Sequence, residues 1–123
     1  MSVADVELLE KSRITVDDDG KAFRLRGILI PFEAILHIEL SSQTTKGNTD
    51  VAAWREQRAV ARIITDDRLH DPVLMEMGVR ASSSDGEPPE FDASLLSVRV
   101  RRIAEAAARV SGKRVLQKPI TSF

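Results

Sequence analysis

Near residue 92 the apolar side chains of this sequence change their spacing from two residues to three or four, which restricts the possible folds. Between residues 13 and 79, apolar and polar side chains alternate in short runs, a pattern typical of strands buried on one face. After residue 92 the apolar side chains form a stripe along one side of a helix. The stripe consists of Leu96, Val100, Ile103, Ala107 and Val110. We therefore expect an α+β fold in which one C-terminal helix covers a sheet.

The N-terminal part of the chain predicts a short helix followed by a β-hairpin. Ser2 stands three residues before Asp5, as in a capping pair, and residues 2–11 carry apolar side chains at helical spacing. The spacing then becomes two on both sides of a polar turn at residues 17–21, which contains three aspartates and a glycine. We expect a helix over residues 2–11 and a hairpin over residues 13–26.

The central part of the chain predicts a bent antiparallel meander, so that the sheet spans residues 13–80. Pro31 cannot donate a backbone hydrogen bond and therefore marks a corner. Residues 41–50 carry no apolar side chain and predict a solvated loop. The other expected segments are a strand containing Leu36, Ile38 and Leu40, an unassigned stretch at residues 51–58, and strands at residues 59–65 and 73–79.

The C-terminal part of the chain predicts a loop, a helix and a tail. Residues 81–91 contain three serines, a glycine and two adjacent prolines, which interrupt the strand pattern. Asp92 can cap the helix that follows, and Gly112 can end it because glycine tolerates a left-handed conformation. The expected boundaries are a loop at 81–91, a helix at 92–111 and a tail at 113–123, within a single domain of residues 1–123.

The order of these elements resembles that of bacterial pleckstrin-homology-like modules. The resemblance rests on residues 13–40, which include the step Ile30-Pro31-Phe32-Glu33-Ala34-Ile35, and on the helix at residues 92–111. In such modules the final helix plugs one end of a bent half-barrel, so the resemblance implies that architecture here. It also implies an anion site, since members that bind phosphoinositides carry a lysine at the first turn and two basic residues on the next strand.

Lys21, Arg24 and Arg26 have the spacing of that phosphate-binding group. Cations side by side on a strand can each donate a charge-assisted hydrogen bond to phosphate. The same turn carries three aspartates at residues 17–19, which repel phosphate, and alternating charge is also typical of the solvated face of an ordinary strand. A phosphoinositide or small-anion site and an ordinary strand surface both remain open from the sequence.

Charge and cysteine content restrict the classes of partner. With 18 basic and 19 acidic side chains, the formal net charge is -1, so the whole molecule has no strong attraction for nucleic acid or an anionic membrane. The arginines of the last helix can pair with Glu105, and nucleic-acid binding is not expected there either. The absence of cysteine excludes disulfides and thiolate zinc sites. With no leader-like segment and no transmembrane-length apolar run, we expect a cytoplasmic protein.

Few residues in the sequence are suited to catalysis or metal binding. His37 and Glu39 lie two apart on an expected strand, so they could form a proton-transfer pair or two ligands of a metal. His70 lies in a turn between Asp66 and Asp71, whose carboxylates could bind a divalent cation or accept hydrogen bonds from nearby backbone amides. A small enzyme or metal site at one of these places is our third hypothesis. We assign no catalytic residue, metal or cofactor.

Three features favour a protein partner or self-association. Trp54 could anchor an interface, although a lone tryptophan more often fills a core. The residues Thr121-Ser122-Phe123 resemble the C-terminal ligands that PDZ domains capture by strand addition. Residues 59–65 lack prolines that would protect a sheet edge, so they could pair with another copy. Our first hypothesis is a non-catalytic protein-binding or assembly module, and anion binding is the alternative.

Overall fold

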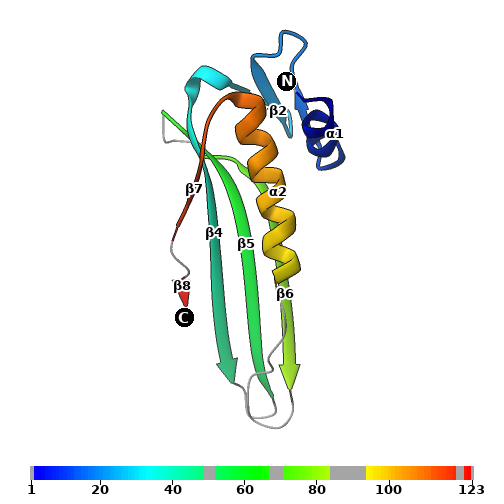
Figure 1. The fold of residues 1–123 in the computed structure, drawn as a ribbon. Coiled ribbons are helices and arrows are strands. Elements are labelled where there is room, and N and C mark those ends of the chain that lie inside the picture. The colour runs from blue at the N-terminus through cyan, green and yellow to red at the C-terminus, as the bar shows by residue number, and fades with distance from the viewer. Residues whose placement is uncertain (1, 49–51, 67–70, 84–93, 119–120, 123) are drawn as a thin grey trace.

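The computed structural model describes residues 2–48, 52–66, 71–83, 94–118 and 121–122. Its elements, in chain order, are α1 (Val3–Lys11), β1 (Ile14–Val16), β2 (Ala22–Leu25), β3 (Ile28–Pro31), the short 3-10 helix η1 (Phe32–Ala34), β4 (Ile35–Asn48), β5 (Ala53–Thr65), β6 (Val73–Ser83), α2 (Ser94–Ser111), β7 (Val115–Gln117) and β8 (Thr121–Ser122). The expected α+β class is confirmed, with two mostly antiparallel sheets (Figure 1). None of the described helices is both long and apolar enough to cross a membrane.

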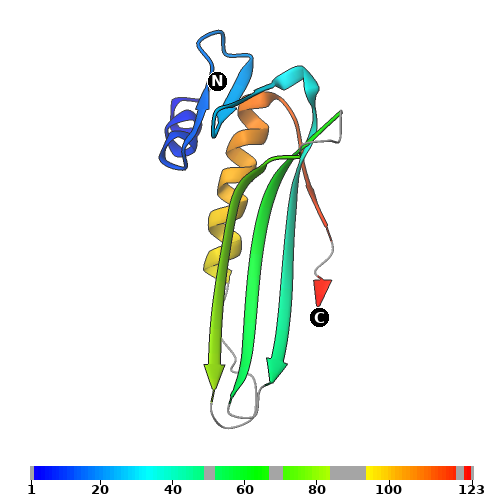
Figure 2. The same cartoon turned by 180° about the vertical axis from the view of Figure 1, so that it is seen from behind.

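The larger sheet is built on three long antiparallel strands in the order β6-β5-β4, and the tail adds β7 and β8 beside β4. Helix α2 lies along one face of these strands (Figure 1). Figure 2 shows the opposite face, which neither of the two described α-helices crosses. The far ends of β4, β5 and β6 extend beyond the first turn of α2 (Figure 1). The helix therefore covers one part of one face and leaves the rest of the sheet open.

The solvated loop expected at residues 41–50 is wrong for residues 41–48, which form the second half of β4. Each of them has a partner on β5, from Ser41 opposite Val60 to Asn48 opposite Ala53. None is buried, because most of this segment extends past the first turn of α2. A strand with water near both faces needs no apolar alternation, so the polar composition was misleading. The same pairing places residues 53–58, unassigned from the sequence, at the start of β5.

A β-bulge at the start of β4 corrects the prediction for Leu36. The register between β4 and β5 shifts between Ile35 and His37. Ile35 is 1% exposed and Leu36 is 49% exposed, whereas simple alternation predicts Leu36 on the buried face with Ile38. The extra residue of a bulge changes the face on which the side chains before it lie. Ile38 and Leu40, which follow the bulge, are buried as expected.

The N-terminal helix and the hairpin are confirmed, and a third strand completes a small sheet. The hydroxyl of Ser2 accepts a hydrogen bond from the backbone N–H of Asp5, at 3.4 Å, and caps α1. β2 pairs antiparallel with both β1 and β3. β3 ends at Pro31 on the edge of this sheet, where a missing N–H is tolerated. The single sheet expected over residues 13–80 is therefore wrong, because the chain changes sheet after Pro31.

The tail pairs with β4 in parallel, so the larger sheet is not a purely antiparallel meander. Val115 of β7 lies opposite Ile38, and Ser122 of β8 lies opposite Thr44. Helix α2 supplies the long connection that a parallel strand requires. β5 pairs with β4 on one side and with β6 on the other. The prediction of a free edge at residues 59–65 is wrong, and β6 forms the edge instead.

The core lies between α2 and the two sheets. The expected helix positions Val100, Ile103, Ala107 and Val110 are buried. Buried alanines on α2 and on β5 keep these two layers close together, because a methyl group needs little space. Gly112 ends α2 with a φ of 71°, as the sequence predicts. The expected cap at Asp92 and the side chain of Leu96 lie outside the described part of the structure.

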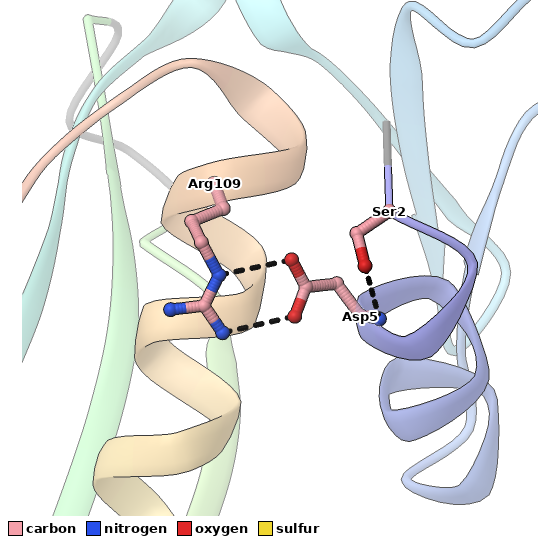
Figure 3. A network of polar contacts seen from close by, with 3 residues as sticks. All are labelled: Ser2, Asp5 and Arg109. Atoms are coloured by element: carbon pink, nitrogen blue, oxygen red, sulfur yellow. Dashed lines mark hydrogen bonds and ion pairs between the residues drawn. The ribbon is translucent and has the colours of Figure 1, made fainter.

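A bidentate ion pair joins α1 to α2 (Figure 3). Arg109 donates from Nε to Oδ2 of Asp5 and from Nη2 to Oδ1, each at 2.9 Å. The two side chains point toward one another across the gap between the helices (Figure 3). These hydrogen bonds lower the pKa of Asp5, while burial of its carboxylate acts in the opposite direction. Helical spacing suggests Glu105 as the partner of Arg109, but the hydrogen-bonded partner is 104 residues away.

Candidate binding surface at the edge of the long sheet

Among the strands that the structure describes, β6 forms one edge of the long sheet, and the short strands β7 and β8 form the other. β6 is 11 residues long and contains neither proline nor lysine. Proteins commonly protect such edges with proline, lysine or very short strands, because unpaired backbone groups can pair with another chain. Pro72 precedes the strand, and Arg26 donates a hydrogen bond to the carbonyl oxygen of its first residue, Val73. Along the rest of the edge, the described residues supply only the charged side chains of Glu76 and Arg80 as protection.

From Met75 onward, after a register shift with β5 at the start of the strand, the side chains of β6 alternate between the two faces of the sheet. Met75 and Met77 lie on the α2 side, where both pack against the core. The register with β5 assigns the remaining positions. Val79 and Ala81 share the α2 side, and Glu76, Gly78, Arg80 and Ser82 share the opposite face. The α2 side of the edge is therefore apolar, and the opposite side is polar and charged.

An apolar groove runs between β6 and the two helices. It has a volume of about 520 Å³, and its apolar lining includes Leu8, Met75, Met77 and Ile103. Its exposed rim carries Lys11, Arg99 and Arg102, whose long stems can cover apolar surface while their charges stay in water. An extended segment beside β6 would place every second side chain toward this groove.

On the opposite face, Arg58 lies between two carboxylates. Its Nη2 is 3.0 Å from Oε1 of Glu56, and its Nη1 is 2.9 Å from Oε1 of Glu76. The side chain of Glu76 nevertheless remains 41% exposed. These three residues line a hollow of about 430 Å³ together with Gly78 and Arg80. The hollow reaches the sheet edge, because three of its lining residues belong to β6.

Trp54 belongs to β5 and lies on the same open face as the hollow. It is opposite Gly47 in the β4–β5 register and is half-buried. The guanidinium carbon of Arg80 lies 4.3 Å from the centroid of its ring. A cation over an indole face is attracted by the negative potential of the ring. Trp54 therefore does not belong to the core between α2 and the sheet, and its ring holds Arg80 beside the edge.

Comparison of the chain with protein-family models, with curated proteins and with solved structures finds no match. The function proposed below therefore rests on the geometry of the β6 edge. Sequence reasoning missed this site because it placed the free edge at residues 59–65. One available signal was Gly78, a glycine inside the alternating run of residues 73–79, since glycine within a strand often marks a close approach by another backbone.

Lys21, Arg24 and Arg26 are distributed along β2 rather than gathered at one point. Lys21 precedes the strand and lines a hollow of about 520 Å³ that also contains Asp17, Asp19 and Glu33. Arg24 lies 3.5 Å from Asp17, and Arg26, beyond the other end of the strand, bonds to the backbone of β6. Carboxylates beside the first two cations and a structural hydrogen bond for the third favour a structural role for this group.

The two sites considered for catalysis or metal binding are also engaged within the chain. The carboxylate of Glu39 is 11% exposed and lies 3.4 Å from Nζ of Lys118, and His37 is half-buried two residues before it. Asp71 accepts hydrogen bonds from the backbone N–H of Thr65, at 3.0 Å, and from its hydroxyl, at 3.3 Å. His70 lies outside the described residues. Within residues that the structure describes, no three metal-ligating side chains gather at one point.

The C-terminal residues proposed as a PDZ ligand lie partly in the larger sheet. Thr121 belongs to β8 and lies opposite Gln43 of β4. Phe123 lies outside the described residues. Because β8 already pairs with β4, a PDZ domain would have to pair with the other side of β8 or displace it from β4. The tail therefore already occupies the edge of the sheet that lies opposite β6.

Proposed function

We propose that this protein is a non-catalytic assembly module that adds a strand of another polypeptide to the open edge of β6. The observation that carries the proposal is the combination of an 11-residue edge without proline or lysine and an apolar groove alongside it. Main-chain hydrogen bonds to the edge supply affinity in this mode of binding, and alternate side chains supply specificity. The incoming strand would carry apolar side chains toward Met75 and Met77.

The resemblance to pleckstrin-homology-like modules remains part of this proposal, and the order of antiparallel strands followed by one amphipathic helix supports it, although α2 lies along a sheet face. We propose the edge of β6 as the binding site, and not the basic residues Lys21, Arg24 and Arg26 that the resemblance implies. An edge site requires no bound cofactor, since the backbone groups of β6 are themselves the recognition elements.

The proposal can be tested with a phage-displayed library of random peptides, each roughly ten residues long. Peptides are selected on the wild-type chain, and their binding to two variants is then compared with their binding to the wild type. Val79→Lys introduces a charge on the α2 side of the edge, at a position that is already 38% exposed. Leu36→Lys is the matched control, because Leu36 is 49% exposed and lies on β4 at the bulge. We expect selected peptides to bind Val79→Lys at least about tenfold more weakly than the control. Equal affinity for the two variants, or failure to select any peptide, would contradict the proposal.

A further inference from the structure

We infer that the strand added to β6 is β6 of a second copy of this chain, paired antiparallel with Gly78 of the two copies opposite each other. This inference rests on the function proposed above and names its partner. It follows from the order of residues along the strand, from the position of one glycine, and from the occupied edge on the other side of the sheet.

The sequence of β6 is complementary to itself in this register. In an antiparallel pair centred on residue 78, each residue before 78 in one copy lies opposite the residue equally far after 78 in the other copy. Opposite side chains lie on the same face. Glu76 of each copy is then opposite Arg80 of the other, and Met77 of each copy is opposite Val79 of the other. Carboxylates meet guanidinium groups on the open face, while apolar side chains meet on the α2 face.

The charges concerned are already held at the edge. Arg58 holds Glu76 at 2.9 Å, and the ring of Trp54 holds Arg80 at 4.3 Å from its centroid. Glu76 retains 41% exposure of its side chain and can accept a second cation. In the paired form, the carboxylate of Glu76 lies between Arg58 of its own chain and Arg80 of the second copy. Preordered charged groups lose less conformational entropy when they pair.

Gly78 is not explained by contacts within the described part of the chain. A Cβ at this position would lie 3.6 Å from the backbone oxygen of Gln57 and 3.7 Å from Nε of Arg58, which are ordinary contact distances. Its φ is not in the left-handed region either. Glycine inside a strand is unfavourable relative to alanine, so its presence indicates a close approach from outside. Two opposite glycines leave open space where the two Glu76–Arg80 pairs meet.

The opposite edge of the sheet explains why this pairing would stop at two copies. β7 and β8 pair with β4 and occupy its outer side. β7 and β8 themselves form that edge, but they are only three and two residues long, and very short edge strands resist pairing with another chain. Among the described strands of this sheet, β6 is thus the one long open edge. Pairing of like edges about a twofold axis closes the assembly as a dimer, and both copies of α2 then lie on the same face of one continuous sheet.

Two complementary charge variants provide the test, with native mass spectrometry and sedimentation velocity as readouts. In Glu76→Arg alone, arginines oppose Arg80 of the other copy, and in Arg80→Glu alone, glutamates oppose Glu76. We expect each variant alone to dimerise at least about tenfold more weakly than the wild type. In an equimolar mixture both cross-strand pairs become opposite in charge, so we expect a heterodimer whose mass distinguishes it from either homodimer. A mixture that associates no better than its components overturns the inference.

Introduced cysteines test the register without altering any charge. The chain has no cysteine of its own, so each variant carries a single thiol. Gly78→Cys is expected to form a disulfide-linked dimer under mild oxidation. Ser82→Cys lies on the same face but would be separated from its counterpart by about 27 Å, at roughly 3.4 Å per residue, and should not cross-link. Preferential cross-linking of Ser82→Cys would contradict the register. A wild-type chain that stays monomeric while selected peptides bind β6 refutes self-pairing and leaves the proposed function intact. If no peptide is selected and the chain also stays monomeric, both the proposed function and the self-pairing are refuted.

Discussion

The ring of Trp54 on β5 lies across Gly47 of β4, in the space that any other side chain at position 47 would occupy. A Cβ on Gly47 would lie 2.4 Å from Cζ2 of the indole ring and 2.5 Å from Cε2. An aromatic ring opposite a strand glycine replaces the packing that the missing side chain cannot provide. Since Arg80 stacks on the same ring, this pair connects the middle of the sheet to the proposed interface.

Replacement of Gly47 by valine should displace the indole ring. We expect Gly47→Val to destabilise the chain by about 1–3 kcal/mol, the usual range for overpacking, and to shift the fluorescence of its only tryptophan to longer wavelength. Urea denaturation at low protein concentration measures the first effect. Gly78→Ala is the matched control, because its added Cβ meets only ordinary contacts, and it should be neutral or slightly stabilising. Equal destabilisation by the two substitutions would be inconsistent with this packing.

The stability of the helix pair should depend on pH through Asp5. Arg109 lowers the pKa of this carboxyl in the folded state, so the stabilisation is fully present above the ordinary pKa of aspartate, near 3.9. It is lost as the pH falls through the lower folded-state pKa. We expect the difference in unfolding free energy between the wild type and Asp5→Asn to be constant at neutral pH and to shrink below about pH 4. A difference that does not change between pH 6 and pH 2.5, within roughly this titration range, would show that the carboxylate charge is not responsible.

Removal of the tail should both destabilise the chain and change its assembly. Deletion of residues 115–123 removes β7 and β8, leaves Glu39 without its ion pair to Lys118, and uncovers the outer side of β4. The outer side of β4, a strand of 14 residues, would then form a second long open edge, and pairing at both long edges produces larger species. Multi-angle light scattering should show them at concentrations at which the full chain forms dimers. Deletion of residues 119–123 alone, which leaves β7 in place, should have a smaller effect on both stability and size.

Local patterns predicted those parts of the fold that are governed by neighbouring residues. The cap at Ser2, the hairpin at residues 13–26, the buried stripe of α2 and the end of that helix at Gly112 all depend on interactions within a few residues. The second half of β4 could not be predicted in this way. Its polar residues become a strand because β5 pairs with them, and that pairing is not encoded in their own alternation.

The candidate site depended on topology, which the sequence does not show directly. Whether an edge is free depends on which strands are neighbours, and the pairing of β5 with both β4 and β6 makes it an inner strand of the sheet. The Asp5–Arg109 pair was hidden for a similar reason, since the two residues are distant in sequence. Trp54 and Gly78 were visible in the sequence, but their roles became evident only when the faces of β5 and β6 were known.

Hydrogen–deuterium exchange as a function of protein concentration tests the central claim, pairing at the β6 edge, most directly. The account predicts that amides of residues 73–83 exchange more slowly at concentrations at which the mass doubles, while those of α1 and β4 are unaffected. Exchange is slowed because amides on the outer side of β6 become hydrogen-bonded in the paired form. A doubling of mass with unchanged exchange in β6, or with protection confined to another element, would contradict it.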